Sequence, residues 1–280
     1  MTYRDQFSQP DEVEILNLRT AARPIVLRTG IEEAPLAIRG TAFMCGFGGR
    51  TYLLTAKHLV KAESIRNLFI LPFQSASKPL SFDKHWPVQA VDENGIEDEG
   101  SDLMPLRIDT AWMTKTDRDQ TNIIKFDTET DWFSTRHTSF FFLFGYPKDK
   151  NYVDYESREL VTAQQFIAGR YITRDEYSGY THRLAIQHSI ASDFQGLSGS
   201  PVMSFTPPGT NTVPGLKFCG MALRGGVESG IIHFLDARSI IGILTDIDNE
   251  DRIPGLHKIS TSKRSSPFIS RRRSLLAPSC

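Results

Sequence analysis

Short apolar runs separated by turn-forming residues fill most of the chain, and this pattern constrains the fold more than any other feature. Eleven runs are rich in Ile, Val, Phe, Leu and Thr and are bounded by Gly, Pro, Asn or Asp, as is typical of β-strands. They cover residues 24–28, 37–45, 51–55, 68–72, 107–113, 139–145, 160–171, 182–188, 201–205, 217–223 and 230–235. One helix is expected at 237–246, with Asp236 as its N-cap. So many strands with so little helix predict an all-β sandwich or a pair of barrels.

The composition is that of an average soluble protein. The 280 residues are 40% hydrophobic and 23% charged, which is enough for one large domain or two small ones and excludes collagen-like, coiled-coil and fully disordered chains. The longest apolar stretch, 139–146, is far shorter than the roughly 20 residues of a membrane-spanning helix. The N-terminus lacks the apolar run of a signal peptide. Three cysteines, Cys45, Cys219 and Cys280, are too few for a disulfide framework, so we expect free thiols and a cytoplasmic location.

Charge divides the chain into a body and a tail. From residue 251 onward seven Lys and Arg stand against one acid, which leaves a net charge of −7 on the first 250 residues. The segment 251–280 is also rich in Ser and Pro, so we expect a disordered basic tail. Its SRRRS stretch is either a solvated segment or a contact for nucleic acid or an anionic surface. Residues 1–22 are interpreted as an N-terminal lead-in to the body.

Three patterns that suggest ligands are better explained by structure. Gly46, Phe47, Gly48 and Gly49 link two strand-like runs and predict a hairpin turn, since no Gly-Lys-Ser/Thr follows them. The acidic stretch 92–99 places Glu97 and Leu103 where a calcium loop needs Gly and Glu. No Cys-x-x-Cys or His-x-x-x-His pair is present for zinc. We therefore expect no metal and no cofactor.

The segment FQGLSGSPV, residues 194–202, has the features of a nucleophile turn. Ser198 lies between Gly196 and Gly199, and Pro201 leads into an apolar run. A nucleophilic serine needs a tight turn that exposes its side chain while nearby amides converge on the developing oxyanion. Glycine and serine also occur in turns for structural reasons alone, so this segment is informative only together with others.

Two further segments supply a base and a carboxylate. The run TYLLTAKH, residues 51–58, delivers His58 to the end of an apolar strand, and LRIDTAW, residues 106–112, embeds Asp109 in another. A buried carboxylate needs a hydrogen-bonding partner, and a histidine Nδ1–H is a natural one. Asp102 is the alternative carboxylate, but it lies in the acidic polar loop. We prefer Asp109 because the carboxylate that orients a histidine should be shielded from water.

Together and in the order His, Asp, Ser, these segments resemble the trypsin-like (chymotrypsin-fold) serine peptidases. LTAKH resembles the histidine motif of that family, DTAW its aspartate motif and GLSGSP its nucleophile loop. The resemblance covers about residues 23–245. It implies an all-β fold with two antiparallel six-stranded barrels, about 23–125 and 138–245, in a peptidase domain of 23–250.

The resemblance also implies a role for each residue. Ser198 attacks the scissile carbonyl, His58 transfers the proton and Asp109 orients the imidazole. The backbone N–H groups of Gly196 and Ser198 form the oxyanion hole. Leu197 stands where members activated by cleavage carry an aspartate, so that route of activation is not expected here. Ser200 replaces a second glycine, and paired disulfides are absent, as in intracellular members of the family.

Substrate specificity is harder to infer. By register with the family, Ser192 and Asp193 lie near the base of the primary pocket. Leu223, Arg224 and Gly225 form the edge that pairs with the substrate. Asp193 favours a basic residue before the scissile bond, whereas His233 or Arg224 favours an acidic one. A solvated loop carboxylate is the plain alternative for Asp193.

The sequence therefore predicts a serine endopeptidase that cleaves a protein or peptide substrate through an acyl-enzyme. The rival hypothesis is a pseudoprotease, a protein-binding scaffold that keeps the fold without turnover. Control by an activating partner, or through the 146–158 and 206–216 loops, is a further hypothesis.

Overall fold

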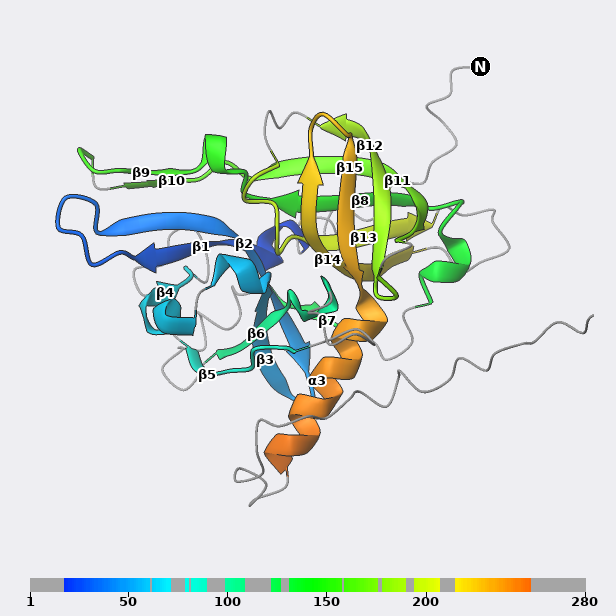
Figure 1. Ribbon diagram of the computed structural model, residues 1–280, viewed down its shortest axis with the longest axis horizontal. Coiled ribbons are helices and arrows are strands. Elements are labelled where there is room, and N and C mark those ends of the chain that lie inside the picture. Colours follow the sequence, from blue (N-terminus) through cyan, green and yellow to red (C-terminus); the bar gives the residue numbers. More distant parts are fainter. Residues whose placement is uncertain are drawn as a thin grey trace, which may run out of the picture.

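Two β-barrels lie side by side, and a C-terminal helix extends from them (Figure 1). The computed structural model describes residues 18–60, 62–71, 79–80, 82–89, 99–108, 122–126, 131–157, 159–175, 178–189, 194–206 and 215–252. The predicted all-β fold with two six-stranded barrels is confirmed, with one barrel closed and the other nearly closed. The basic tail beyond Arg252 lies outside the described residues.

The first barrel is formed by a sheet with the strand order β4-β1-β2-β3-β6-β5, to which β7 adds in parallel beside β2. Its strands are β1 (Ala22–Arg28), β2 (Leu36–Phe47), β3 (Arg50–Thr55), β4 (Leu68–Phe69), β5 (Phe82–His85), β6 (Met104–Ile108) and β7 (Ile124–Lys125). The predicted hairpin joins β2 to β3 through Gly48 and Gly49, which both adopt positive φ angles of 57° and 77°, as a tight hairpin turn requires. Short 3₁₀ segments η1 (Lys57–Leu59), η2 (Ala62–Asn67) and η3 (Glu99–Ser101) connect these strands.

The second barrel is closed, in the order β11-β12-β15-β14-β13-β8. Its strands are β8 (Phe140–Gly145), β11 (Gln165–Arg174), β12 (Thr181–Ser189), β13 (Pro201–Thr206), β14 (Gly215–Gly226) and β15 (Ile231–Asp236). Two further 3₁₀ segments, η4 (Phe133–Thr135) and η5 (Lys148–Lys150), flank β8. The run expected at 160–171 divides into β11 and β10 (Glu159–Val161), which pairs with β9 (Tyr152–Asp154) outside the barrel.

One hydrophobic core joins the two barrels and the helix. Phe43 and Tyr52 of the first barrel belong to the same buried cluster as Phe141 and Leu197 of the second, and Ile240 of the helix joins them. Because burial of apolar surface drives association, this shared core holds the barrels against each other. A separate cluster fills the first barrel itself.

Helix α3 (Ala237–Arg252) begins where expected, since the Asp236 carboxylate accepts a hydrogen bond from the backbone N–H of Arg238 at 2.9 Å. It continues six residues beyond the predicted end. Ile247 is buried, and Asp248 pairs with Arg50 of β3 at 3.1 Å. Contacts with the first barrel therefore stabilise the last turns of the helix. Among the described helices, none is both long and apolar enough to cross a membrane.

Candidate active site

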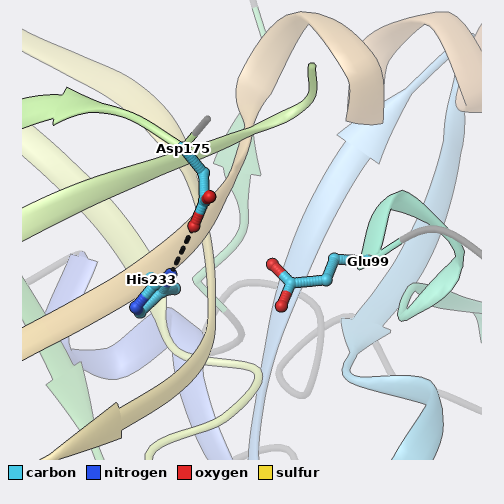
Figure 2. A group of neighbouring side chains, drawn as sticks. All are labelled: Glu99, Asp175 and His233. Atoms are coloured by element: carbon cyan, nitrogen blue, oxygen red, sulfur yellow. Dashed lines mark hydrogen bonds and ion pairs between the residues drawn. The ribbon is translucent and has the colours of Figure 1, made fainter. Parts of the chain in front are cut away.

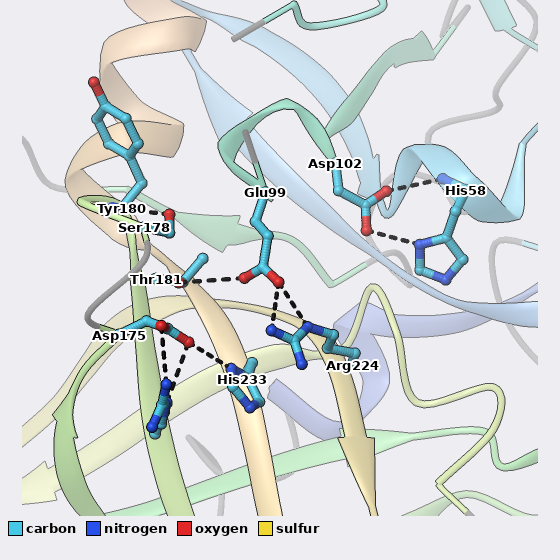
Figure 3. A network of polar contacts seen from close by, with 10 residues as sticks. His58, Glu99, Asp102, Asp175, Ser178, Tyr180, Thr181, Arg224 and His233 are labelled. Atoms are coloured by element: carbon cyan, nitrogen blue, oxygen red, sulfur yellow. Dashed lines mark hydrogen bonds and ion pairs between the residues drawn. The ribbon is translucent and has the colours of Figure 1, made fainter. Parts of the chain in front are cut away.

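His58 follows β3 on η1 and is held at two points by one carboxylate. Its backbone N–H donates to Asp102 Oδ1 at 2.9 Å, and its Nδ1 lies 2.7 Å from Asp102 Oδ2 (Figure 3). A carboxylate oxygen accepts only, so Nδ1 carries the proton. The other ring nitrogen, Nε2, is then the basic one. The imidazole thus has the tautomer and the fixed orientation of a general base.

The partner of His58 is Asp102, where the sequence analysis preferred Asp109. The physical reason is the strand register. β3 and β6 are antiparallel, and Thr55 pairs with Met104. Residues just after β3 and residues just before β6 therefore meet at one end of this strand pair, which brings His58 to Asp102. The far end of β6 pairs with the start of β3, since Tyr52 lies opposite Arg107.

Asp109 itself lies outside the described residues. Asp102 was set aside as a residue of a polar loop, but the chain turns inward there. Gly100 and Ser101 of η3 are buried, and the Asp102 side chain is 24% exposed. The signal that identifies Asp102 is the antiparallel pairing of 51–55 with 104–108, which no single motif contains.

Ser198 lies on a tight turn between Phe194 and β13. Gly196 and Gly199 have φ angles of +88° and +86°, a region that other residues rarely adopt. A Cβ on Gly199 would lie 2.0 Å from the carbonyl oxygen of Thr41. The turn is therefore pressed against β2 of the first barrel, and only glycine fits at this point.

Three carbonyl groups of this turn accept hydrogen bonds from Lys148 and Thr41. The Gln195 carbonyl accepts from the Lys148 N–H at 2.8 Å, the Gly196 carbonyl from Thr41 Oγ1 at 2.7 Å and the Ser198 carbonyl from the Thr41 N–H at 3.3 Å. In a planar trans peptide the N–H points opposite to the carbonyl, so the Gly196 N–H points away from Lys148. In the part of the chain that the structure describes, the Gly196 and Ser198 N–H groups donate to no acceptor.

A cleft of about 350 Å³ contains both halves of the candidate site. His58 and Ser198 line it together with Gly196, as do the predicted substrate-edge residues Leu223, Arg224 and Gly225. Ser198 Oγ donates a hydrogen bond to the Leu223 carbonyl at 2.6 Å. Ser192 and Asp193, expected at the base of the pocket, lie outside the described residues. Further lining residues that the sequence analysis did not identify are Ile38, Arg39, Leu59, Lys148, Phe194 and Gln195.

A polar network that includes Arg224 of the cleft lining connects the two barrels. Arg224 Nε donates to Glu99 Oε1 at 2.7 Å, so a strand of the second barrel is paired with η3 of the first (Figure 3). Thr181 Oγ1 approaches the other Glu99 oxygen at 3.4 Å. Glu99 precedes Asp102, the partner of His58, by three residues. Arg224 follows Leu223, whose carbonyl accepts the hydrogen bond from Ser198. The ion pair between Glu99 and Arg224 therefore joins the two segments that hold His58 and Ser198.

His233 was a candidate for binding acidic substrate side chains. Its Nδ1 instead lies 3.0 Å from Asp175 Oδ2, within hydrogen-bonding distance (Figure 2). Burial lowers the pKa of His233, and the Arg224 charge lowers it further, against the opposing effect of Asp175 and Glu99. Burial and the Arg224 charge thus favour the neutral form of His233. Ligand atoms of Glu99, Asp175 and His233 lie within 4.8 Å of one another. Arg224 and Arg183 already balance the two carboxylates, so ion pairing accounts for this cluster.

No family model and no curated protein sequence matches the chain, whereas its fold is similar to that of solved structures. The Vibrio cholerae VesB protease aligns with a TM-score of 0.53 and 12% identity over 82% of this chain, and the match spans 64% of the VesB chain. A mutant of human heparin binding protein aligns with a TM-score of 0.52 and 12% identity, and the match covers 89% of this chain and 96% of that protein. Mouse neuropsin, a serine protease, aligns with a TM-score of 0.52 and 12% identity, and the match covers 82% of this chain and 95% of neuropsin. At such identities the likeness establishes the fold, which is the chymotrypsin fold.

Proposed function

We propose that this protein is a serine endopeptidase in which Ser198, His58 and Asp102 form the triad. One observation carries the proposal: the His58 ring is fixed by Asp102 through both its backbone and Nδ1, and it lines the same cleft as Ser198. A solvent-exposed histidine with only a structural role does not require two hydrogen bonds, from its backbone and its ring, to the same carboxylate. Asp102 takes the role that the sequence analysis assigned to Asp109.

The reaction follows from these positions. Ser198 Oγ attacks the scissile carbonyl carbon while His58 Nε2 accepts the hydroxyl proton, and the carbonyl oxygen becomes an oxyanion. The Gly196 and Ser198 N–H groups stabilise that oxyanion. His58 then gives its proton to the leaving amine, which breaks the C–N bond and leaves an acyl-enzyme. Water, deprotonated by His58, releases the acid and restores Ser198.

The substrate lies across the cleft in an extended form. The edge of β14 at Leu223, Arg224 and Gly225 offers backbone groups for strand pairing with the residues before the scissile bond. In the structure Ser198 Oγ donates to the Leu223 carbonyl. Rotation of the serine side chain about χ1 to another staggered rotamer releases this bond.

The same hydrogen bond favours a second candidate function, a pseudoprotease that binds proteins. If Ser198 keeps the Leu223 carbonyl as its acceptor when a ligand is bound, no proton reaches His58 and no acyl-enzyme forms. One structural neighbour is named for binding heparin and not for proteolysis. The chymotrypsin fold alone therefore leaves both functions open.

Digestion of an unfolded protein separates the two candidates. Purified wild type is incubated with reduced, unfolded casein, and the fragments are identified by mass spectrometry. The proposal predicts fragments from the wild type and none from Ser198→Ala prepared in parallel, which controls for contaminating proteases. Absence of any fragment that depends on Ser198, while the wild type binds casein, supports the scaffold.

The cellular setting remains part of the proposal. Cys45 and Cys219 are buried free thiols, and burial raises the pKa of both, which makes them unreactive. Unpaired cysteines suit the cytoplasm, where we place the protein. We also propose control by an activating partner, and cleavage of casein at full speed by the free protein, unaffected by any partner, would contradict it. Contact of the 251–280 tail with nucleic acid or an anionic surface is tested by removing the tail and measuring binding and proteolysis separately.

A further inference from the structure

The candidate cleft has a one-sided charge. Among the described residues that line it are three permanently cationic side chains, Arg39, Lys148 and Arg224, and no carboxylate. In a cleft between low-dielectric walls, charges of one sign reinforce each other and concentrate ligands of the opposite sign. The body as a whole carries net negative charge, so this local excess is not a property of the overall composition.

The three cations differ in how they are compensated. Arg224 forms an ion pair with Glu99, which neutralises much of its field. Arg39, on β2, and Lys148, at the start of η5, are both exposed. Within the part of the chain that the structure describes, neither of these two side chains has a carboxylate partner. The uncompensated charge therefore lies with Arg39 and Lys148.

Arg39 of β2 and Lys148 of η5 line the cleft beside the Ser198 turn, and they form a second wall made of other segments than the β14 edge. The Lys148 backbone N–H donates a hydrogen bond to the carbonyl of Gln195, the residue before Gly196 of the proposed oxyanion hole. Arg39 precedes Gly40, where a Cβ would lie 3.5 Å from the Gly196 carbonyl oxygen. If the residues before the scissile bond pair with β14, the residues after the bond leave the site along this second wall.

We propose that Arg39 and Lys148 select acidic side chains at the first two positions after the scissile bond. This inference rests on the proposed peptidase function and names its substrate class, protein segments with Asp or Glu on the leaving side of the cut. Exposed ion pairs are individually weak and are screened by salt. We therefore expect Asp and Glu to be enriched about fivefold at these two positions of the cleaved substrates at low ionic strength, and the enrichment to decrease as salt is added.

A peptide library tests the preference through cleavage. Wild-type protein digests a library of proteome-derived peptides, and mass spectrometry identifies each cleaved bond. The proposal predicts Asp and Glu enriched about fivefold at the two positions after the bond, and loss of this enrichment in the double variant Arg39→Gln/Lys148→Gln. Lys150→Gln is the matched control, since Lys150 is exposed on the same 3₁₀ segment but does not line the cleft. Cleavage without enrichment, or enrichment that survives the double variant, overturns the proposal.

A binding measurement makes the test independent of turnover. Fluorescein-labelled Ala-Gly peptides that differ only in a central Glu-Glu or Lys-Lys pair are titrated with Ser198→Ala, with and without the double substitution, and anisotropy is recorded. We expect the Glu-Glu peptide to bind about fivefold more tightly, and this advantage to vanish with both cations removed. Equal affinity, or no measurable binding of either peptide, contradicts the selection. Selective binding without any cleavage by the wild type contradicts the peptidase function while the charge selection stands.

Discussion

The two barrels hold their parts of the candidate site in different ways. The first barrel presents His58 and Asp102 on short segments outside its strands, and the His58 side chain is 49% exposed. The second barrel holds Ser198 on a turn whose neighbours Leu197, Gly199 and Ser200 are buried. His58 is held by a single carboxylate, whereas the Ser198 turn faces the cleft on one side and is fixed by buried neighbours on the other. Chemistry in the first half thus depends on individual polar contacts, and in the second half on backbone geometry.

This difference predicts distinct consequences of substitution. A change in the first barrel is expected to reduce turnover while the fold survives. A change in the Ser198 turn is expected to disturb the packing between the barrels, because the turn contacts Thr41 of β2 directly.

The largest expected effect is on catalysis, from the partner of His58. Asp102→Asn keeps the size of the side chain but cannot hold the required tautomer, so kcat should fall by about 10⁴-fold while the unfolding transition is nearly unchanged. Asp109→Asn is the matched comparison and should leave kcat within a few-fold. Steady-state kinetics on one peptide substrate measure both. The opposite ranking would return the orienting role to Asp109.

The next largest effect is on stability, from the Ser198 turn. Gly199→Ala adds a Cβ 2.0 Å from the Thr41 carbonyl oxygen at a positive φ, and we expect a loss of about 3 kcal/mol or more in the free energy of unfolding. Gly30→Ala also has a positive φ but meets no atom within 4 Å, so its cost should be only about 1 kcal/mol. Urea unfolding measures both, and equal costs would show that contact between the barrels contributes nothing at this turn.

The buried carboxylate of Asp236 in the second barrel allows a test of how acid affects stability. Burial raises the pKa of Asp236, but hydrogen bonds from His182 and Arg238 outweigh this and hold it well below its usual range. Because the folded-state pKa is the lower one, the stabilisation is present above the unfolded pKa of about 4 and is lost as the pH falls below it.

Asp236→Ala should therefore cost about 3 kcal/mol at pH 7 and flatten the loss of stability below about pH 4. Asp246→Ala, an exposed acid on the same helix, should change stability by less than about 0.5 kcal/mol. Unfolding curves recorded from pH 7 to pH 2 compare the variants. An unchanged acid slope in Asp236→Ala would assign the pH dependence to other carboxylates.

The smallest effect is expected from the link between the barrels. Glu99→Gln removes the charge that holds Arg224, and both side chains are partly exposed, so kcat/KM should fall only about two- to fivefold. Addition of salt should reduce the wild-type advantage. Glu228→Gln, an exposed acid beyond β14, serves as the control. A loss as large as that of Asp102→Asn would mean that Glu99 acts directly on the site.

Local features of this molecule could be predicted from the sequence, and features that depend on distant pairing could not. The hairpin at Gly48 and Gly49 and the N-cap at Asp236 are each encoded within a few residues. Asp102 could not be chosen over Asp109, because the choice depends on which end of β6 lies beside the end of β3. The short strands β5, β7 and β9 have too few apolar residues to form a recognisable pattern.

Long-range pairing also explains the remaining differences. The last turns of α3 depend on Asp248 meeting Arg50, 198 positions earlier in the chain. The contact between Glu99 and Arg224 joins residues 125 positions apart. Neither pair has a local signature, since each exists only when the two barrels and the helix are assembled.

Labelling with a fluorophosphonate tests whether Ser198, His58 and Asp102 form a working triad, because this reagent reacts with a serine only where a base and an oxyanion hole activate it. Wild type, Ser198→Ala, His58→Ala and Asp102→Asn are treated in parallel, and the labelled peptide is identified by mass spectrometry. We expect a single adduct at Ser198 in the wild type, none in the first two variants and markedly slower labelling in the third. A folded wild type that takes up no label, or labelling that is indifferent to His58, would contradict an assembled triad.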